Sequence, residues 1–327
     1  MDSPCLAPLL SQAQRLDSLR LRTGGAVPGM PGDAPAFTLS FHDPSPVPVL
    51  IAVPHGGRAY PEALVAQMRH PAQAGLRLED RLADVLGEGV ARETGAPLLV
   101  AHAPRAMVDL NRATDDVDWG MVAPHPRGGT PAAVLGGRAR GGLGLVPRRV
   151  PGMGELWKRP LDRAELDSRI AEVHVPYHRT LGETLADLRD RWGAALLVDL
   201  HSMPPLPPRG AEPPASIVIG DRFGAACAGE LVGAAFGYLA RARVRSAHNR
   251  PYAGGYVLER HAARNEGIHC LQVEVDRSCY LDDGLGELGP WFDEMVDVLA
   301  GLVRHLAGEV AELGRERDSD RWRMAAE

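Results

Sequence analysis

The stretch 194–203, AALLVDLHSM, sets the fold class. Its first half is a continuous apolar run, which is typical of a strand buried on both faces in a mostly parallel sheet. The run ends in Asp199, His201 and Ser202, and two prolines follow at once. Open α/β sheets bind ligands at the carboxyl ends of their strands, so His201 is a candidate functional residue. A histidine that only packs in the core explains this stretch, taken alone, equally well.

Similar apolar runs recur along the chain and predict further buried strands. Stretches of helical periodicity separate most of them, and strands that alternate with helices favour one α/β sandwich around a mostly parallel sheet. The runs span residues 48–53, 96–102, 215–220 and 268–275.

We therefore predict a single α/β domain over residues 1–327, with two unusual segments. Residues 113–155 are irregular and rich in Gly, Pro and Arg, and their length indicates a long lid or an insertion. The polar residues 314–327 are expected to form a frayed tail. A helix over 163–191 should be interrupted by Pro176.

Composition narrows the function classes. The net charge is −6 and the pI about 6.1, with no basic run that interleaves with aromatic residues, so nucleic acid is not an expected partner. The longest apolar stretches are too short for a membrane span, and the N-terminus lacks the basic region of a signal peptide. The 4 cysteines form no CxxC pair, which is typical of reduced thiols in a cytoplasmic protein.

A second histidine, His55, follows the apolar run at 48–53, so two histidines stand at the ends of two buried strands. Catalytic zinc sites usually take three protein ligands and keep one position open. Asp80, at the start of a predicted helix, could supply a carboxylate, and Glu79 is the near alternative. Glu274, near the end of a buried strand, is the best candidate to accept a proton from water activated by the metal. A salt bridge to a nearby arginine would also explain Glu274.

The segment 105–112 carries charges suited to an anionic substrate. Arg105 is a candidate to stabilise an oxyanion, and Asn111 with Arg112 suits the binding of a substrate carboxylate, because arginine offers a forked donor. Asp109 and the two arginines could instead form a structural ion-pair network. No G-x-S-x-G motif surrounds Ser202, so a serine hydrolase is not favoured.

Seven motifs occur in an order that resembles the N-formylglutamate amidohydrolases, over about residues 48–285. They are PHGGRAYP (54–61), LEDRLADVL (78–86), RAMVDLNR (105–112), PYH (176–178), VDLHSMP (198–204), NRPYAGGY (249–256) and HCLQVEVDRSCY (269–280).

The resemblance implies a three-layer fold like that of zinc carboxypeptidases and aspartoacylases. It also implies a zinc-dependent hydrolase that converts N-formyl-L-glutamate and water into formate and L-glutamate. Three alternatives stay open. The protein could be another zinc N-acyl amino acid amidase, a metallo-carboxypeptidase, or a binding protein that keeps the fold without the chemistry.

The resemblance assigns roles to individual residues. His55 and His201 match the metal-binding histidines. Arg58 stands where carboxypeptidases carry the glutamate of H-x-x-E, so the third ligand is expected from the Glu79–Asp80 pair, and we select Asp80. The remaining roles are the general base for Glu274, polarisation of the scissile carbonyl for Arg105, and substrate binding for Asp109, Asn111, Arg112 and Tyr256.

Overall fold

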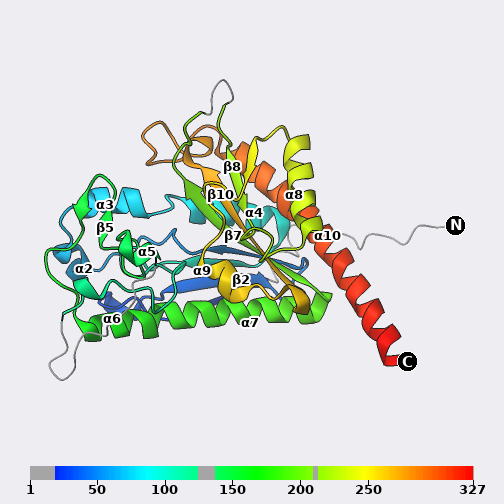
Figure 1. The fold of residues 1–327 in the computed structure, drawn as a ribbon, viewed down its shortest axis with the longest axis horizontal. Helices are drawn as coiled ribbons and strands as arrows, with labels where there is room; N and C mark the ends of the chain where they lie inside the picture. Colours follow the sequence, from blue (N-terminus) through cyan, green and yellow to red (C-terminus); the bar gives the residue numbers. More distant parts are fainter. Residues whose placement is uncertain (1–18, 124–136, 209–212, 327) are drawn as a thin grey trace.

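The computed structural model describes residues 19–123, 137–208 and 213–326, with side chains to residue 319. Its centre is an eight-stranded mixed sheet of order β1-β2-β4-β3-β7-β10-β8-β9 (Figure 1). The four central strands β4, β3, β7 and β10 run parallel, while β1, β2 and β8 are antiparallel to their inner neighbours and β9 is parallel to β8. The strands are β1 Leu19–Gly24, β2 Phe37–His42, β3 Val49–Val53, β4 Leu98–Ala101, β7 Ala195–Met203, β8 Ile217–Gly220, β9 Ser246–His248 and β10 Ile268–Asp276.

Helices cover both faces of this sheet, which confirms the predicted three-layer α/β fold. On one face α7 runs along the strands, and Leu197 of β7 packs in one core with Leu181 and Leu185 (Figure 1). On the other face α4, α8 and α10 form a second core that includes Leu200. The helices are α2 Glu62–Gln67, α3 Pro71–Leu78, α4 Ala83–Thr94, α5 Gly137–Arg140, α6 Arg163–Arg169, α7 Val175–Trp192, α8 Gly229–Arg241, α9 Tyr256–His261 and α10 Phe292–Ala326.

The register of β7 and β10 gathers polar side chains at one edge of the sheet. His201 lies opposite Glu274, and Asp199 lies opposite Gln272. Because side chains alternate along a strand and parallel partners share a face, these four side chains lie on the α7 side. The intervening Leu200 points into the other core. The strands thus present acids, an amide and an imidazole together, near their carboxyl ends.

Pro176 interrupts the helical segment as predicted. Residues Ile170–His174 form a π-helical turn between α6 and α7. Proline has no N–H, so the carbonyl four residues earlier, that of Glu172, lacks its helical partner. It accepts instead from the backbone N–H of Ala26 at 3.0 Å. The turn ends in His174 and precedes His178 of α7, and both histidines belong to the site described below.

The irregular segment 113–155 is packed against the domain wherever it is described. Val117, Met121, Leu145 and Val150 all belong to the core on the α7 side. Short elements lie within it, including α5 and a two-stranded ribbon of β5 Arg149–Val150 with β6 Gly154–Glu155. Residues 124–136 of the predicted lid lie outside the described residues. Its role as a lid or an insertion stays a prediction.

The C-terminal segment differs from the prediction of a frayed tail, because α10 continues through residues 314–326 (Figure 1). Contacts with the domain support this last part. The backbone of Gly314 lies against Gly193, where an added Cβ on Gly193 would meet the Gly314 carbonyl oxygen at 2.5 Å. Arg317 donates to the carbonyl of Asn265 at 2.8 Å. Within the described residues, no helix combines the length and apolarity that crossing a membrane requires.

Candidate metal centre and active site

Three of the predicted residues meet at the carboxyl end of the central strands. His55 follows β3, Asp80 lies between α3 and α4, and His201 lies in β7, with ligand atoms that are all within 4.8 Å of one another. The Nδ1 atoms of His201 and His55 lie 2.9 and 3.5 Å from Oδ2 of Asp80. All three side chains are buried. Among the described residues, this is the one group of three or more such side chains close enough to share a metal ion.

The far side of each imidazole is held by a buried carboxylate. Nε2 of His55 lies 2.8 Å from Oδ1 of Asp109, and Nε2 of His201 lies 2.9 Å from Oδ2 of Asp199. A carboxylate only accepts, so each Nε2 carries the hydrogen and each Nδ1 of the neutral ring keeps its lone pair for a ligand. Carboxylates placed behind histidines in this way are typical of metal sites.

One ring nitrogen in the cluster is left unsatisfied by the protein. Nδ1 of His55 is buried and has no hydrogen-bond partner among the described residues. Leaving a buried polar atom unpaired typically costs about 1–3 kcal/mol. A divalent cation between His55, Asp80 and His201 would satisfy this atom, so the donor set fits a metal ion such as zinc.

The charged groups around this cluster also favour a positive charge between the three side chains. Burial lowers the pKa of His201, but Asp199 and Asp80 outweigh it and raise that pKa well above its ordinary value. Burial raises the pKa of Asp80, but the hydrogen bond with His201 and the nearby imidazole of His55 outweigh it and hold that pKa well below its ordinary value. Asp80 is therefore an anion, and a metal ion at this point would take the place of the extra proton on His201.

The structure separates Asp80 from its neighbour Glu79. The backbone N–H of Asp80 donates to the carbonyl of His55 at 2.9 Å, which ties the two predicted ligands together. The side chain of Glu79 turns away and pairs with Arg81 at 3.2 Å. Arg277 lies 3.6 Å from Oδ1 of Asp80, on the side away from the histidines. This geometry favours Asp80 over Glu79 as the carboxylate of the cluster.

Glu274 lies beside this cluster and is 7% exposed. Burial raises its pKa to about 8, with His201 opposing the change and Asp80 adding to it. Its Oε1 accepts a hydrogen bond from Nε2 of Gln272 at 2.8 Å. A carboxyl whose pKa lies near neutrality, next to a metal-type cluster, is suited to general acid–base chemistry.

Arg105 and Asp109 form an ion pair behind His55, in which the carboxylate is buried and the guanidinium is partly exposed. Nε of Arg105 donates to Oδ2 of Asp109 at 2.9 Å, and the N–H of Asn111 donates to Oδ1 of Asp109 at 2.9 Å. Burial raises the pKa of Asp109, but Arg105 and Arg112 outweigh it and hold that pKa well below its ordinary value. Asp109, predicted from the sequence to bind substrate, is fully buried, and its oxygens are taken by protein groups. Its position therefore suits the orientation of His55 instead.

The other predicted substrate-binding residues lie next to this pair. Arg112 donates from Nε to the carbonyl of Leu143 at 2.9 Å and from Nη1 to that of Asn111 at 2.6 Å. Oδ1 of Asn111 accepts from the N–H of Val257 at 2.9 Å, at the start of α9. Tyr256 begins that helix, and its hydroxyl accepts from Arg260 at 2.8 Å.

Two histidines that the sequence analysis did not assign hold the backbone of this segment, and a third, His261, contacts one of them. Nε2 of His178 donates to the carbonyl of Leu110 at 2.9 Å, and Nε2 of His174 donates to that of Arg112 at 2.8 Å. Nδ1 of His178 lies 2.9 Å from Nε2 of His261. Burial lowers the pKa of His178 well below its ordinary value and that of His261 to about 3, so both rings are neutral. The motif PYH was the one sequence signal for this cluster.

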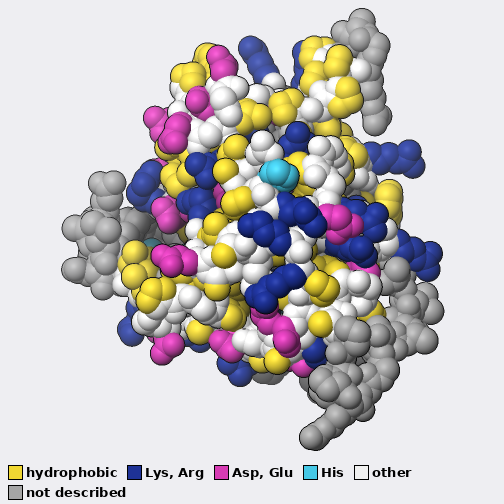
Figure 2. Space-filling model, turned by 90° about the vertical axis from the view of Figure 1, so that its left-hand side faces the viewer, with side chains coloured by type: hydrophobic (Ala, Val, Ile, Leu, Met, Phe, Trp, Pro, Cys, Tyr) yellow, Lys and Arg dark blue, Asp and Glu magenta, His cyan; other side chains and the backbone are white. Residues whose placement is uncertain are grey.

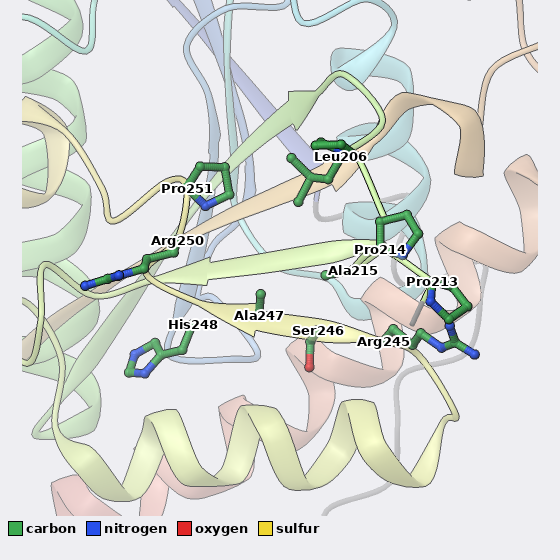
Figure 3. A pocket seen from close by; sticks show the side chains of 11 residues that line it. Leu206, Pro213, Pro214, Ala215, Arg245, Ser246, Ala247, His248, Arg250 and Pro251 are labelled. Carbon is green, nitrogen blue, oxygen red and sulfur yellow. The ribbon is translucent and has the colours of Figure 1, made fainter. Parts of the chain in front are cut away.

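A pocket of about 590 Å³ lies over the edge strand β9, away from the metal cluster (Figure 3). Ala247 faces it, and the register Ala247–Val218–Glu274 puts this pocket on the same face of the sheet as the candidate base. Figure 3 shows Arg245 and Arg250 at opposite ends of the pocket, with side chains that point away from its centre. None of the predicted site residues lines it.

The face around α2, α3 and α5 carries basic and acidic side chains interspersed (Figure 2). Several of these charges are paired, as in the ion pairs of Arg148 with Asp118 and Glu155, both at 3.0 Å. This view of the surface shows no continuous basic patch.

The sequence of this chain is similar to those of known proteins. The family model described as N-formylglutamate amidohydrolase matches residues 47–281. The N-formylglutamate deformylase of Pseudomonas aeruginosa is 30% identical over 283 residues, which cover 83% of this chain and 95% of that protein. The enzyme of the same name from Pseudomonas putida is 30% identical over 265 residues, 75% of this chain and 85% of that protein.

A solved structure extends the likeness to the whole fold. The crystal structure of N-formylglutamate amidohydrolase from Ralstonia eutropha JMP134 superposes with a TM-score of 0.74 and 31% identity, over 86% of this chain and 99% of that chain. A protein from Agrobacterium tumefaciens, at 17% identity and a TM-score of 0.59, shares the fold. Sequence and structure together show that this chain belongs to the N-formylglutamate amidohydrolase family.

Proposed function

We propose that this protein is a zinc-dependent hydrolase that cleaves the N-formyl amide of N-formyl-L-glutamate, giving formate and L-glutamate. The observation that carries the proposal is the buried cluster of His55, Asp80 and His201 beside Glu274, with Nδ1 of His55 unsatisfied. Family membership and the names of the relatives support the substrate. The three described cysteines are free thiols, which is consistent with a reducing, cytoplasmic environment.

His55, Asp80 and His201 would hold the metal. Zinc, when bound there, would polarise the formyl carbonyl and make a water molecule more acidic. Asp109 and Asp199 keep both rings in the tautomer with Nδ1 free, so we assign Asp109 this orienting role rather than contact with substrate.

Glu274 would act as the general base. It takes a proton from the attacking water as the new C–O bond forms, and it delivers that proton to the nitrogen of glutamate as the C–N bond breaks. Arg105 would stabilise the negative charge on the carbonyl oxygen. Only its Nε is hydrogen-bonded among the described contacts, which leaves both Nη groups for the substrate.

The substrate carboxylate would lie against Arg112 and the Asn111 segment. A forked guanidinium suits a carboxylate, and Arg112 is buried next to Asp109, which holds its charge in place. Tyr256 packs on His174 and His178, with ring centroids 5.8 and 5.3 Å apart, and we propose that it borders the substrate on this side.

The test is a substrate panel with protein reconstituted with zinc. N-formyl-L-glutamate should release formate in preference to N-formylglutamine, in which one carboxylate is lost, and over N-acetylglutamate, whose acyl group is larger. Preference for the acetyl substrate would favour the alternative of a different N-acyl amino acid amidase. If the zinc-bound protein hydrolyses none of the substrates in the panel, the alternative of a binding protein is favoured.

A further inference from the structure

A chain of side-chain amides connects helix α9 to the candidate base. The backbone N–H of Val257 donates to Oδ1 of Asn111 at 2.9 Å, and Nδ2 of Asn111 donates to Oε1 of Gln272 at 3.4 Å. Nε2 of Gln272 then donates to Oε1 of Glu274 at 2.8 Å. The three side chains are buried, so water does not compete for these bonds.

The direction of this chain follows from its first member. A backbone N–H can only donate, so the oxygen of the Asn111 amide must face Val257 and its nitrogen must face Gln272. Because the Asn111 nitrogen donates, the oxygen of the Gln272 amide must face Asn111. The nitrogen of Gln272 then faces Glu274. One carboxylate oxygen of Glu274 is therefore always an acceptor from Gln272.

We propose that Gln272 is a positioning residue for Glu274: it commits one carboxylate oxygen to a hydrogen bond and leaves the other to carry the proton during hydrolysis. The inference rests on the proposed role of Glu274 as general base. Without Asn111 the Gln272 amide could flip, accept a hydrogen bond from protonated Glu274 and hold the proton away from the reaction. Asn111 therefore has two proposed roles: it orients Gln272, and it belongs to the segment that binds the substrate carboxylate.

The position of Gln272 on β10 supports this role. It lies two residues before Glu274 on the same face of the strand, opposite Asp199 of β7. Cys270, the preceding residue on this face, belongs to the apolar core. An amide at such a position is costly unless both its ends are hydrogen-bonded, and in the described part of the chain Asn111 and Glu274 are its two partners.

The first test is Gln272→Met, which keeps the approximate volume and removes both hydrogen bonds. Zinc content and KM for N-formylglutamate should stay within about twofold, while kcat falls about 10- to 100-fold, the range for a lost hydrogen bond to a charged group. Val273→Ala is the matched control, because Val273 is buried on the opposite face of the same strand. It should lower the unfolding temperature and leave kcat close to that of the parent.

The second test is a double-mutant cycle with Glu274→Gln. If Gln272 acts through Glu274, Gln272→Met should change kcat less than about twofold in the Glu274→Gln background. Equal losses in both backgrounds, or parental kcat in Gln272→Met, would overturn the inference. Gln272→Glu, which keeps the shape but turns the donor into an acceptor, serves if the Met variant does not fold, and its kcat should fall at least as far.

The two levels of the proposal fail differently. Parental turnover in Glu274→Gln would remove the base assignment and the Gln272 inference with it. A large loss in Glu274→Gln alongside parental kcat in the folded Gln272 variants would keep Glu274 as the base and reject only Gln272.

Discussion

At the scale of single residues, the structure adds two carboxylates behind the proposed metal ligands His55 and His201. Asp199 is fully buried and bonded to Nε2 of His201, as Asp109 is to Nε2 of His55. A carboxylate in this place fixes the ring and increases its basicity. We therefore expect Asp109 and Asp199 to affect metal binding together with the proposed ligands.

We expect Asp199→Asn to weaken zinc binding about 10- to 100-fold, because the variant keeps a hydrogen-bond acceptor but loses the negative charge. Competition with a chelator measures the affinity. Asp221→Asn is the control, since Asp221 is also a buried aspartate but pairs with Asn249 and His248 instead of a ligand. Equal zinc affinity in the parent and Asp199→Asn would count against this role.

For Arg112→Ala we expect KM for N-formylglutamate to rise about 10- to 100-fold, since one charged hydrogen bond is worth about 1.5–3 kcal/mol. Steady-state kinetics of the zinc-loaded protein give the value. Arg148→Ala, which removes the ion pairs with Asp118 and Glu155, is the control. The role is wrong if the parent hydrolyses a substrate with a neutral amide in place of the carboxylate equally well.

Glu274→Gln should keep zinc and the fold and lose about 10²–10⁴-fold in kcat, the usual contribution of general acid–base catalysis. Metal analysis and turnover are measured on the same preparation. Turnover within a few-fold of the parent would move the base elsewhere. Loss of zinc would make Glu274 a ligand or the support of one, and the role of Asp80 would need revision.

At the scale of elements, the π-helical turn before α7 sets the start of the helix that carries His178. The carbonyl of Glu172, in this turn, accepts a hydrogen bond from the backbone N–H of Ala26, which lies far away in the sequence. Gly25 makes this approach possible, because its φ is +60° and an added Cβ would lie 2.3 Å from the Glu172 oxygen.

Gly25→Ala should therefore lower the free energy of unfolding by about 1–3 kcal/mol, through the clash and the left-handed backbone together. Gly32→Ala separates the two causes, since Gly32 has a φ of +66° and no atom within 4 Å of an added Cβ. Denaturant unfolding gives both values. Equal destabilisation of the two variants would show that the contact with Glu172 contributes nothing.

At the scale of the whole molecule, the metal cluster connects parts of the chain that only folding brings together. His201 and Asp80 are 121 positions apart in sequence, and His55 and Asp109 are 54 apart. The unfolded chain has no such site, so zinc should bind the native state selectively and stabilise it.

Zinc at 100 times its dissociation constant should raise the stability of the protein by about 2.7 kcal/mol, and chelation should reverse the gain. Thermal unfolding with and without the chelator measures it. His201→Ala should lose both the bound zinc and this difference, whereas His305→Ala, a histidine of α10, should keep both. A full equivalent of zinc in purified His201→Ala would mean that the ligand assignment is wrong.

The sequence by itself determined the features that depend on local pattern. Apolar runs identified the buried strands, and Pro176 marked the break before α7. His55 and His201 were identified as candidate metal ligands because they follow or end such runs. Asp80, Arg105 and Glu274 were candidates from their residue types and positions, and the ordered motifs identified the family that assigns them the same roles. These properties are encoded over a few residues, so a single chain is enough to predict them.

Only the tertiary structure decided which of these groups touch one another. It turned Glu79 towards Arg81 and Asp80 towards the histidines. It also placed Asp109 against Nε2 of His55, Asp199 against Nε2 of His201, and Gln272 against Glu274. It also continued α10 where the sequence predicted a frayed tail, through contacts with Gly193 and Asn265. The physical reason is that hydrogen bonds and desolvation act over a few ångströms in space, and strand register and helix packing set which distant residues come that close.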